Sequence, residues 1–445
     1  MAAPPARRQY IPRIIDAELT ELLAGLGAVM IQGAKAIGKT ATAQRHAART
    51  VRLDRGAVAD VVRADPAGAI REPFPVFFDE WQRVPAILDE VRTRIDDDPR
   101  PGLAILAGSA EPPKAARPTH TGAGRIVTRR MRPLTLSERL LPADGRHADG
   151  RDTVSVAALL RGTRPAVRGA SPWGLADYAR EIVASGFPAI RPLPPRLRAA
   201  QLEGYVEHLV TREVEEANGA AANPATVRRW LTAYAAATAT TTSLEKLRDV
   251  ATAGDGTTPA KTTVLRYRDA LERLFIYDPV PAWKPGGTAL SRLGEAPKIH
   301  LVDPGLSAHL LGVDEGALMD GAMPPLVEAV PAVRDGGLFG ALFESLVAQS
   351  LRTYAQAADA AHHYVRTHGG EREVDGLLVR WDHRCVAYEV KLAGAVGSDD
   401  VRHLRWLRDH LGDVVLDAVV IHTGPEAYRR REDGIAVVPA AMLVP

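Results

Sequence analysis

Short apolar runs alternate with amphipathic stretches through the first 140 residues, and this alternation predicts strands and helices in turn. The runs that predict strands lie at residues 28–31, 51–54, 75–80, 103–109 and 126–127. Apolar residues near helical spacing predict a helix over 12–25, and a second helix-like run covers 41–48. Strands that alternate with helices in this way are typical of an α/β domain.

The pattern changes after residue 140. Residues 141–170 show little periodicity, which predicts an exposed connection. Helical spacing returns over 175–214, interrupted by a turn at 185–188. Further helix-sized pieces lie at 227–237, 244–251 and 262–274, before a predicted strand at 274–280. Three short helices followed by a strand indicate a winged helix, whose last helix can either enter a DNA groove or serve as a spacer or protein contact.

A new α/β block begins at 299–304, and a long amphipathic helix opens at residue 338. Two strands follow at 374–381 and 385–391, and they flank a predicted three-residue hairpin loop at 382–384. The chain therefore begins and ends with α/β patterns and has a mainly helical stretch between them.

Composition limits the classes of function. The chain has 445 residues, enough for two or three domains, and its net charge of +2 gives no general attraction to nucleic acid or membranes. The single Cys385 permits no internal disulfide, and no apolar run approaches the length of a membrane span. Together with an N-terminus that lacks the apolar core of a signal peptide, this predicts a cytoplasmic protein without a membrane partner.

One motif lies between the first predicted strand and the helix-like run after it. The pattern G-x-x-x-x-G-K-[ST] is formed by Gly33, Ala34, Lys35, Ala36, Ile37, Gly38, Lys39 and Thr40. In a strand-loop-helix setting this pattern predicts a phosphate-binding loop, whose backbone N–H groups surround the phosphates of a nucleotide. Lys39 is expected to reach the terminal phosphates, and the Thr40 hydroxyl is expected to hold Mg²⁺.

Two carboxylates follow the third predicted strand. Asp79 is expected to bind the Mg²⁺ shell, and Glu80 is expected to orient or deprotonate the attacking water. Ser109 ends the next predicted strand, where it is either a sensor of the terminal phosphate or part of a turn. Arg125 is a further candidate for the terminal phosphate, from the same or a neighbouring subunit, although an ion-paired structural role is the alternative.

The series GAKAIGKT, VFFDEWQRVP, ILAGS and GAGRIVTRRMRPLTLSE resembles the AAA+ ATPases of bacteria and archaea that carry a C-terminal domain of unknown function. The resemblance implies ATP as the nucleotide and a five-stranded parallel sheet with helices on both faces. It also places Gly33, Gly38, Lys39 and Thr40 in the phosphate loop. Asp79 and Glu80 take the metal and water positions, and Ser109 stands where many members have Asn.

Charged residues also gather on the predicted C-terminal hairpin. If Trp381 pairs with Cys385, then Asp375 lies opposite Lys391, with Glu389 on the same face. Such carboxylates can hold Mg²⁺, and the lysine can stabilise charge on an attacking water or a phosphate. With Glu344 on the preceding helix, the set is similar to the PD-(D/E)xK nuclease pattern. That resemblance implies Glu344, Asp375 and Glu389 as metal ligands, with Glu389 and Lys391 in catalysis.

These observations predict an α/β P-loop AAA+ domain at 1–170, a helical lid and winged helix at 171–285, and an α/β nuclease-like domain at 286–445. The predicted function is a Mg²⁺-dependent ATPase with a regulatory or DNA-associated role. An ATP-gated DNA endonuclease and a nucleotide-responsive binding protein without turnover are the alternatives. ATP and Mg²⁺ are the predicted cofactors, DNA is a candidate partner through Arg266, Arg268 and Arg273, and a homo-oligomer is left open.

Overall fold

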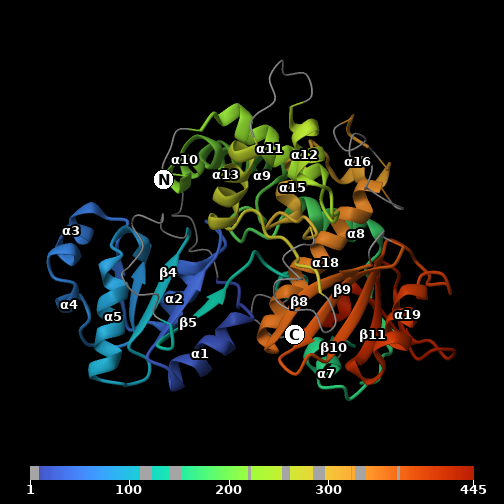
Figure 1. Ribbon diagram of the computed structural model, residues 1–445, viewed down its shortest axis with the longest axis horizontal. Coiled ribbons are helices and arrows are strands. Elements are labelled where there is room, and N and C mark those ends of the chain that lie inside the picture. The colour runs from blue at the N-terminus through green and yellow to red at the C-terminus, as the bar shows by residue number, and fades with distance from the viewer. Residues whose placement is uncertain are drawn as a thin grey trace, which may run out of the picture.

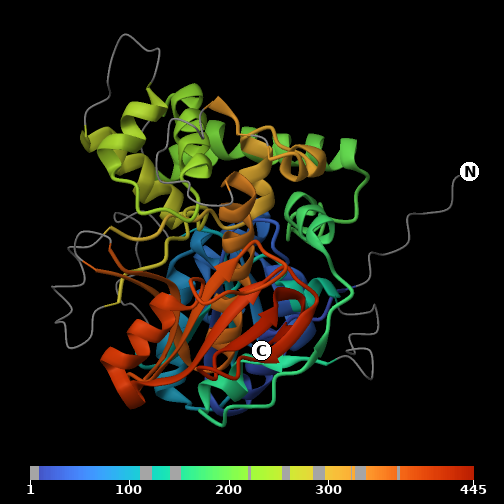
Figure 2. The same ribbon diagram turned by 90° about the vertical axis from the view of Figure 1, so that its right-hand side faces the viewer.

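The computed structural model describes residues 10–110, 123–140, 152–218, 222–252, 261–283, 296–321, 323–325, 337–367 and 371–445. Figure 1 shows an N-terminal sheet with its helices, a second sheet formed by C-terminal residues, and a layer of helices above them. In the view of Figure 2 the helical layer lies across the top of the molecule. Within the described ranges, no helix combines the length and apolar character needed to cross a bilayer.

The N-terminal sheet is fully parallel. Its strands are β1 (Ala28–Gln32), β2 (Arg49–Arg52), β3 (Val76–Asp79), β4 (Ala104–Gly108) and β5 (Ile126–Arg130). They lie in the order β2-β3-β4-β1-β5. The chain passes from β1 to the edge strand β2, returns through β3 and β4, and places β5 on the other side of β1. This arrangement confirms the predicted α/β class and the five-stranded parallel sheet.

Helices cover both faces of this sheet. They are α1 (Ile15–Gly25), α2 (Lys39–His46), α3 (Gly56–Ala64), α4 (Pro66–Ala69) and α5 (Ala86–Asp97), with a short 3-10 turn η1 (Trp81–Arg83). Successive residues of β1 belong to different cores: Val29 packs with the α1 side and Met30 with the α3 and α5 side. Both side-chain sets are buried, which is why the parallel strands are continuous apolar runs rather than alternating ones.

The middle of the chain is helical. Its helices are α6 (Leu136–Leu140), α8 (Leu175–Ala184), α9 (Pro195–His208), α10 (Val214–Asn218), α11 (Pro224–Ala236), α12 (Leu244–Ala251) and α13 (Lys261–Arg273), with a π-helix η3 (Leu209–Glu213). Side chains of Asn223 and Ser243 accept hydrogen bonds from backbone N–H groups at the starts of α11 and α12. These caps explain why the predicted helices at 227–237 and 244–251 are confirmed.

The predicted strand at 274–280 was wrong as a regular element. Its residues form only isolated bridges, Tyr277 with Leu301 and Val280 with Lys298. Pro279 and Pro281 have no backbone N–H to donate, and proline in a strand interrupts regular pairing. The predicted boundary at residue 285 lies outside the described residues.

The C-terminal sheet is mixed. Its longer strands are β8 (Ala360–Arg366), β9 (Glu373–Arg380), β10 (Cys385–Lys391), β11 (Val415–His422), β12 (Glu426–Arg429) and β13 (Ala436–Pro439). With the short strand β7 (Gly169–Ala170) at one edge, the order is β7-β12-β13-β11-β10-β9-β8. The remaining elements are α15 (Pro304–Leu310), α16 (Glu315–Met319), α18 (Gly337–Ala357), α19 (Arg402–Leu411), β14 (Leu443–Val444) and the 3-10 turns η5 (Gly412–Val414) and η6 (Ala440–Met442).

Helices α18 and α19 cover the two faces of the C-terminal sheet. Leu346 of α18 packs in one core with Leu378 and Tyr388 of the sheet. Leu404 and Leu407 of α19 belong to a separate core on the other face. The sheet is therefore buried between two layers, and side chains at its edges and strand ends are the ones that reach the surface.

The described part of 141–170 corrects the predicted exposed connection in part: residues 154–160 form a mostly buried strand and helix, and 169–170 add a strand to the C-terminal sheet, while most of 161–168 is exposed. The strands β6 (Val154–Ser155) and β7 (Gly169–Ala170) enclose helix α7 (Val156–Leu160). Strand β7 pairs with β12, and β6 pairs with β14. The segment was missed because each strand has only two residues, too few for a period to appear in the sequence.

The register of the C-terminal hairpin differs from the predicted one. Cys385 pairs with Val379, not with Trp381, and the connection spans Trp381 to Arg384. The shift amounts to two residues, so it keeps every side chain on its predicted face. It brings Asp375 beside Glu389 instead of opposite Lys391.

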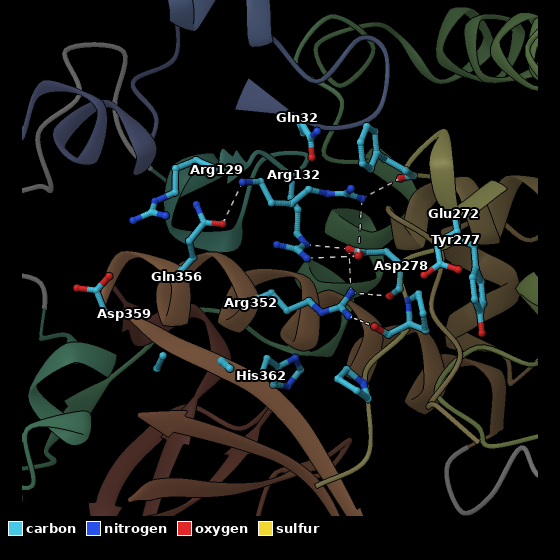
Figure 3. A pocket seen from close by; sticks show the side chains of 16 residues that line it. Gln32, Arg129, Arg132, Glu272, Tyr277, Asp278, Arg352, Gln356, Asp359 and His362 are labelled. Atoms are coloured by element: carbon cyan, nitrogen blue, oxygen red, sulfur yellow. Dashed lines mark hydrogen bonds and ion pairs between the residues drawn. The ribbon is translucent and has the colours of Figure 1, made fainter. Parts of the chain in front are cut away.

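Asp278 is a centre of ion pairs between three parts of the chain. Its carboxylate lies 2.8 Å from Arg132 Nε, which follows β5, and 2.8 Å from Arg352 Nη1 on α18. Figure 3 shows Arg132 and Arg352 pointing to Asp278 from different elements around a cavity of about 720 Å³. Burial raises the pKa of the Asp278 carboxyl, but the charges of Arg132, Arg352 and Arg130 outweigh burial and hold it well below its ordinary value.

We expect Asp278→Asn to lower the free energy of unfolding by about 3–5 kcal/mol, because it leaves buried guanidinium groups without their carboxylate. Since the folded pKa is depressed, the carboxylate stabilises the protein above the unfolded pKa of about 4, and this contribution is lost as the pH falls below that value. Urea unfolding at pH 7 and pH 3 measures both effects. Asp269→Asn, at an exposed aspartate of α13, is the control, and an equal loss in both variants would contradict a special role for Asp278.

Candidate functional site

The phosphate loop lies between the end of β1 and the start of α2. Gly38 has φ of 100°, in the left-handed region that glycine adopts without strain, and α2 begins at the next residue. A Cβ on Gly33 would lie 2.3 Å from the carbonyl oxygen of Met131, so no side chain fits there. Ala34 and Ile37 are fully buried, and Ala36 also has a positive φ of 65°. The loop thus presents backbone and not side chains along its inner surface.

Lys39 is folded into this loop. Its Nζ donates to the carbonyl oxygens of Gly33 at 2.8 Å and Ala34 at 2.7 Å. Burial lowers the pKa of Lys39 to about 8, against the opposing effect of Glu80 and Asp79. The ammonium group is held by two neutral carbonyls and faces two carboxylates, which is a position from which it can bind anionic phosphate oxygens.

Thr40 and Asp79 lie together, as predicted. The Thr40 hydroxyl donates to both oxygens of the Asp79 carboxylate, at 3.0 and 3.1 Å. Burial raises the pKa of Asp79, although the bond from Thr40 opposes the rise. A hydroxyl beside a carboxylate supplies the hard oxygen ligands that Mg²⁺ prefers, so these two residues fit the ion that the motif implies.

Glu80 contacts the end of the neighbouring strand. It has a left-handed φ of 57°, and its Oε2 accepts a hydrogen bond from Ser109 Oγ at 2.8 Å. Gln82 Nε2 donates to the same oxygen. Ser109 is buried at the carboxyl end of β4, so the predicted phosphate sensor is in direct contact with the predicted water-orienting residue.

The sequence did not predict a buried ion pair whose arginine is hydrogen-bonded to the loop. Arg13 Nε lies 2.9 Å from Glu138 Oε1, and Arg13 Nη1 donates to the carbonyl oxygen of Ile37 at 2.9 Å. Glu138 also accepts from the backbone N–H of Thr135. The available signal was Glu138 itself, an acidic residue among the apolar Leu134, Leu136 and Leu140.

Arg125 does not lie near the phosphate loop of its own chain. It precedes β5 at the amino end of the sheet, where it forms a 2.8 Å ion pair with Asp96 of α5. In parallel strands the loop and the carboxyl ends share one edge, so the predicted contact within one subunit was wrong. Arg130, which ends β5 and pairs in register with Gln32, lies at the correct edge, and its charge contributes to the lowered pKa of Lys39.

The C-terminal candidates come together around a residue that was not predicted. Glu344 of α18 and Asp375 of β9 lie 2.8 and 3.2 Å from the ammonium nitrogen of Lys298. Glu389 and Lys391 of β10 form a 3.3 Å ion pair beside them. Lys298 carried no motif, and its only signal was a lone lysine next to an apolar run in a chain with eight lysines.

The predicted metal site at Glu344, Asp375 and Glu389 was wrong for this arrangement. Among the described residues, no group of three or more His, Cys, Asp or Glu side chains is placed to hold a metal ion. The reason is electrostatic and steric, because the Lys298 ammonium already lies between the carboxylates.

Two of the three arginines predicted as DNA contacts have protein partners. Arg273 donates to the backbone carbonyl of Ala217 at the end of α10. Arg268 forms a 3.4 Å ion pair with Asp269. Arg266 shares helix α13 with them. None of these contacts favours a nucleic-acid interface over a structural role.

Comparisons with known proteins agree with this site. Residues 27–140 match the AAA domain family, residues 175–317 match the domain of unknown function DUF8612, and residues 339–443 match the domain of unknown function DUF4143. The first match contains the loop, Asp79, Glu80 and Ser109.

Similar proteins are found along the whole chain. Two uncharacterized proteins, one from Mycobacterium bovis and one from Mycobacterium tuberculosis, are each 25% identical over 454 residues, covering 100% of this chain and 88% of theirs. Among solved structures, a Walker-type ATPase of Pyrococcus abyssi has 14% identity and a TM-score of 0.38, covering 69% of this chain and 98% of its own. The parallel sheet, the loop geometry and the match over 27–140 identify a P-loop AAA domain in these residues, and two further domains of unknown function follow it.

Proposed function

We propose that the protein is a Mg²⁺-dependent ATPase whose nucleotide state is relayed to the helical and C-terminal parts of the chain. The observation that carries the proposal is the set of side chains along one edge of the N-terminal sheet. Lys39, the Thr40–Asp79 pair and the Glu80–Ser109 pair come from three different elements and meet there.

Each of these groups has a distinct task in phosphoryl transfer. The backbone of the loop and the N-terminus of α2 bind the β- and γ-phosphates, and the Lys39 ammonium neutralises charge that develops on them. The Glu80 carboxylate orients the attacking water and accepts its proton. Ser109 and Gln82 fix the Glu80 carboxylate through two hydrogen bonds, and its orientation therefore depends on the end of β4.

Thr40 and Asp79 would hold the magnesium ion. When bound, Mg²⁺ neutralises charge on the β- and γ-phosphate oxygens. The residues themselves position each other, because the Asp79 carboxylate is buried and its two oxygens share the Thr40 hydroxyl.

Three ion pairs support the relay. Lys35, in the loop, lies 2.8 Å from Glu213 at the end of the π-helix η3. Arg132, just after β5, is joined through Asp278 to Arg352 on α18. A change in the loop or in the end of β5 therefore acts directly on the helical layer and on the helix that supports the C-terminal sheet.

The test is release of phosphate from ATP by the full-length protein, with Mg²⁺ and with EDTA. We expect turnover with Mg²⁺ that EDTA abolishes and that Asp79→Asn reduces by at least tenfold. Turnover that Asp79→Asn leaves unchanged would contradict the assignment of this site. No observation on the described residues favours DNA cleavage as a second function.

A further inference from the structure

The C-terminal carboxylates surround an internal cation. Lys298 Nζ lies 2.8 Å from Glu344 Oε1, 3.2 Å from Asp375 Oδ1 and 3.3 Å from Glu373 Oε1. The Lys298 side chain is only 1% exposed. A compact ammonium charge with three carboxylates at these distances takes the place that a metal ion has in a carboxylate site.

Lys298 is charged in this position. Burial lowers the pKa of the Lys298 ammonium, but the carboxylates of Glu344, Asp375 and Glu373 outweigh burial and raise it well above its ordinary value. Removing one partner from such a buried set would leave the remaining charges without compensation. The carboxylates and the lysine therefore depend on each other.

One carboxylate oxygen of the cluster is not satisfied. Glu389 comes directly after Tyr388, which pairs with Gly376 in the register of β9 and β10, so it lies next to Asp375, and its side chain is 4% exposed. Its Oε1 is buried and has no hydrogen-bond donor among the described residues, with His403 Nδ1 at 3.9 Å. Glu389 also lines a cavity of about 460 Å³ together with Glu344, Asp375 and Lys391. A buried carboxylate oxygen aimed into a cavity beside two others indicates a place that attracts cations.

We propose that Lys298 is a built-in counter-ion that closes this carboxylate cluster to divalent cations. The carboxylates are a set of metal ligands whose centre is occupied by the ammonium group of Lys298. This explains why the nuclease-like residues are present although the described residues contain no group placed to hold a metal ion. Removing the ammonium group, while the ligands remain, opens the cluster to Mn²⁺ or Mg²⁺.

The position of Lys298 is fixed by its backbone. Its N–H donates to the carbonyl of Val280 and its carbonyl accepts from the Val280 N–H, both at 2.9 Å. Two residues from Val280 and two residues from Lys298, the N–H of Asp278 donates to the carbonyl of His300. Lys298 is therefore attached to the same short ladder that carries Asp278, the centre of the ion pairs with Arg132 and Arg352.

The test is Mn²⁺ binding to the full-length protein without nucleotide. Binding is measured as the decrease in the spectroscopic signal of free Mn²⁺. The variants are Lys298→Met, which keeps the length of the side chain but removes its charge, and the double variant Lys298→Met with Glu389→Gln. We expect Lys298→Met to gain about one bound Mn²⁺ per chain over the parent, and the double variant to lose that gain. The phosphate loop is unchanged in all three proteins, so its contribution cancels.

Lys391→Met is the matched control. It removes the same charge from a partly exposed lysine of the same cluster, 3.3 Å from Glu389, while Lys298 stays in place. We expect no gain of Mn²⁺ in this variant. An equal gain in both lysine variants would overturn the proposal, because net charge and not the position of Lys298 would then control binding.

Two further results would overturn the proposal. One is a folded Lys298→Met protein that binds no more Mn²⁺ than the parent. The other is Mn²⁺ binding by the parent that Glu389→Gln removes. If Lys298→Met does not fold in EDTA, its thermal unfolding is measured with increasing Mn²⁺. Recovery of folding by Mn²⁺ that Glu389→Gln abolishes supports the proposal, and failure of Mn²⁺ to restore folding contradicts it.

Discussion

Replacement of Lys39 by alanine is expected to lower the rate of ATP hydrolysis by about 10²–10³-fold. Lys39 is buried inside the loop, and its Nζ donates to the loop's own carbonyl oxygens. Without it, the backbone N–H groups alone face the phosphates, and both binding and turnover suffer. The measurement is phosphate release at saturating ATP, together with ATP affinity from a fluorescent nucleotide analogue.

Lys246→Ala is the control for this prediction. Lys246 is an exposed lysine of α12 that lines the C-terminal cavity, so its loss changes the net charge by the same amount. Its turnover should match that of the parent. Comparable losses in both variants would mean that charge in general, and not the loop lysine, supports hydrolysis.

Replacement of Glu80 by glutamine is expected to separate binding from turnover. The amide keeps the size of the side chain but cannot accept a proton from water, so the rate should fall by about 10²–10⁴-fold while ATP affinity is retained. The Ser109 hydroxyl lies 2.8 Å from Glu80 Oε2 and can donate equally well to an amide oxygen. The local structure should therefore survive, and single-turnover kinetics with a parallel binding titration would measure both quantities.

Ser109→Ala complements the Glu80 variant. Because Ser109 acts on Glu80 through one hydrogen bond, its loss should reduce turnover less than the loss of the carboxylate itself. A Glu80→Gln protein with parental turnover would assign water activation to another residue.

The N-terminal part of the fold was predictable because its information is local. The loop from Gly33 to Thr40 is one uninterrupted motif, and Asp79 and Glu80 follow a strand that is apolar throughout. Parallel strands bring their carboxyl ends to one edge, which is why the Thr40–Asp79 contact followed from strand order. The prediction for Arg125 broke the same rule, since Arg125 comes before its strand and not at the carboxyl end of it.

The C-terminal candidates were predictable in identity but not in pairing. Strand alternation fixed the shared face of Asp375 and Glu389, and a hairpin loop two residues longer between its closing pair moved the register by two without changing that face. As a result, Asp375 lies beside Glu389 instead of opposite Lys391, and Lys391 lies at the end of its strand.

Contacts between distant parts of the chain could not be predicted. Lys298 reaches Glu344 and Asp375 only because two proline-containing segments form a short ladder, and no periodic pattern records that approach. Arg13 and Glu138 likewise meet across more than a hundred residues of sequence. Such contacts depend on how whole elements pack, and a single sequence contains no direct signal of them.

The pairing of β6 with β14 has a consequence for the order in which the chain folds. Val154 and its partner Leu443 are separated by almost 290 residues of sequence. Strand β7 and its partner β12 are also far apart in the sequence. These pairings therefore form only after the whole intervening chain has been made, and closing so long a loop makes them slow, late steps. The parallel sheet of the AAA domain, whose five strands all lie before residue 131, has no such dependence and can form first.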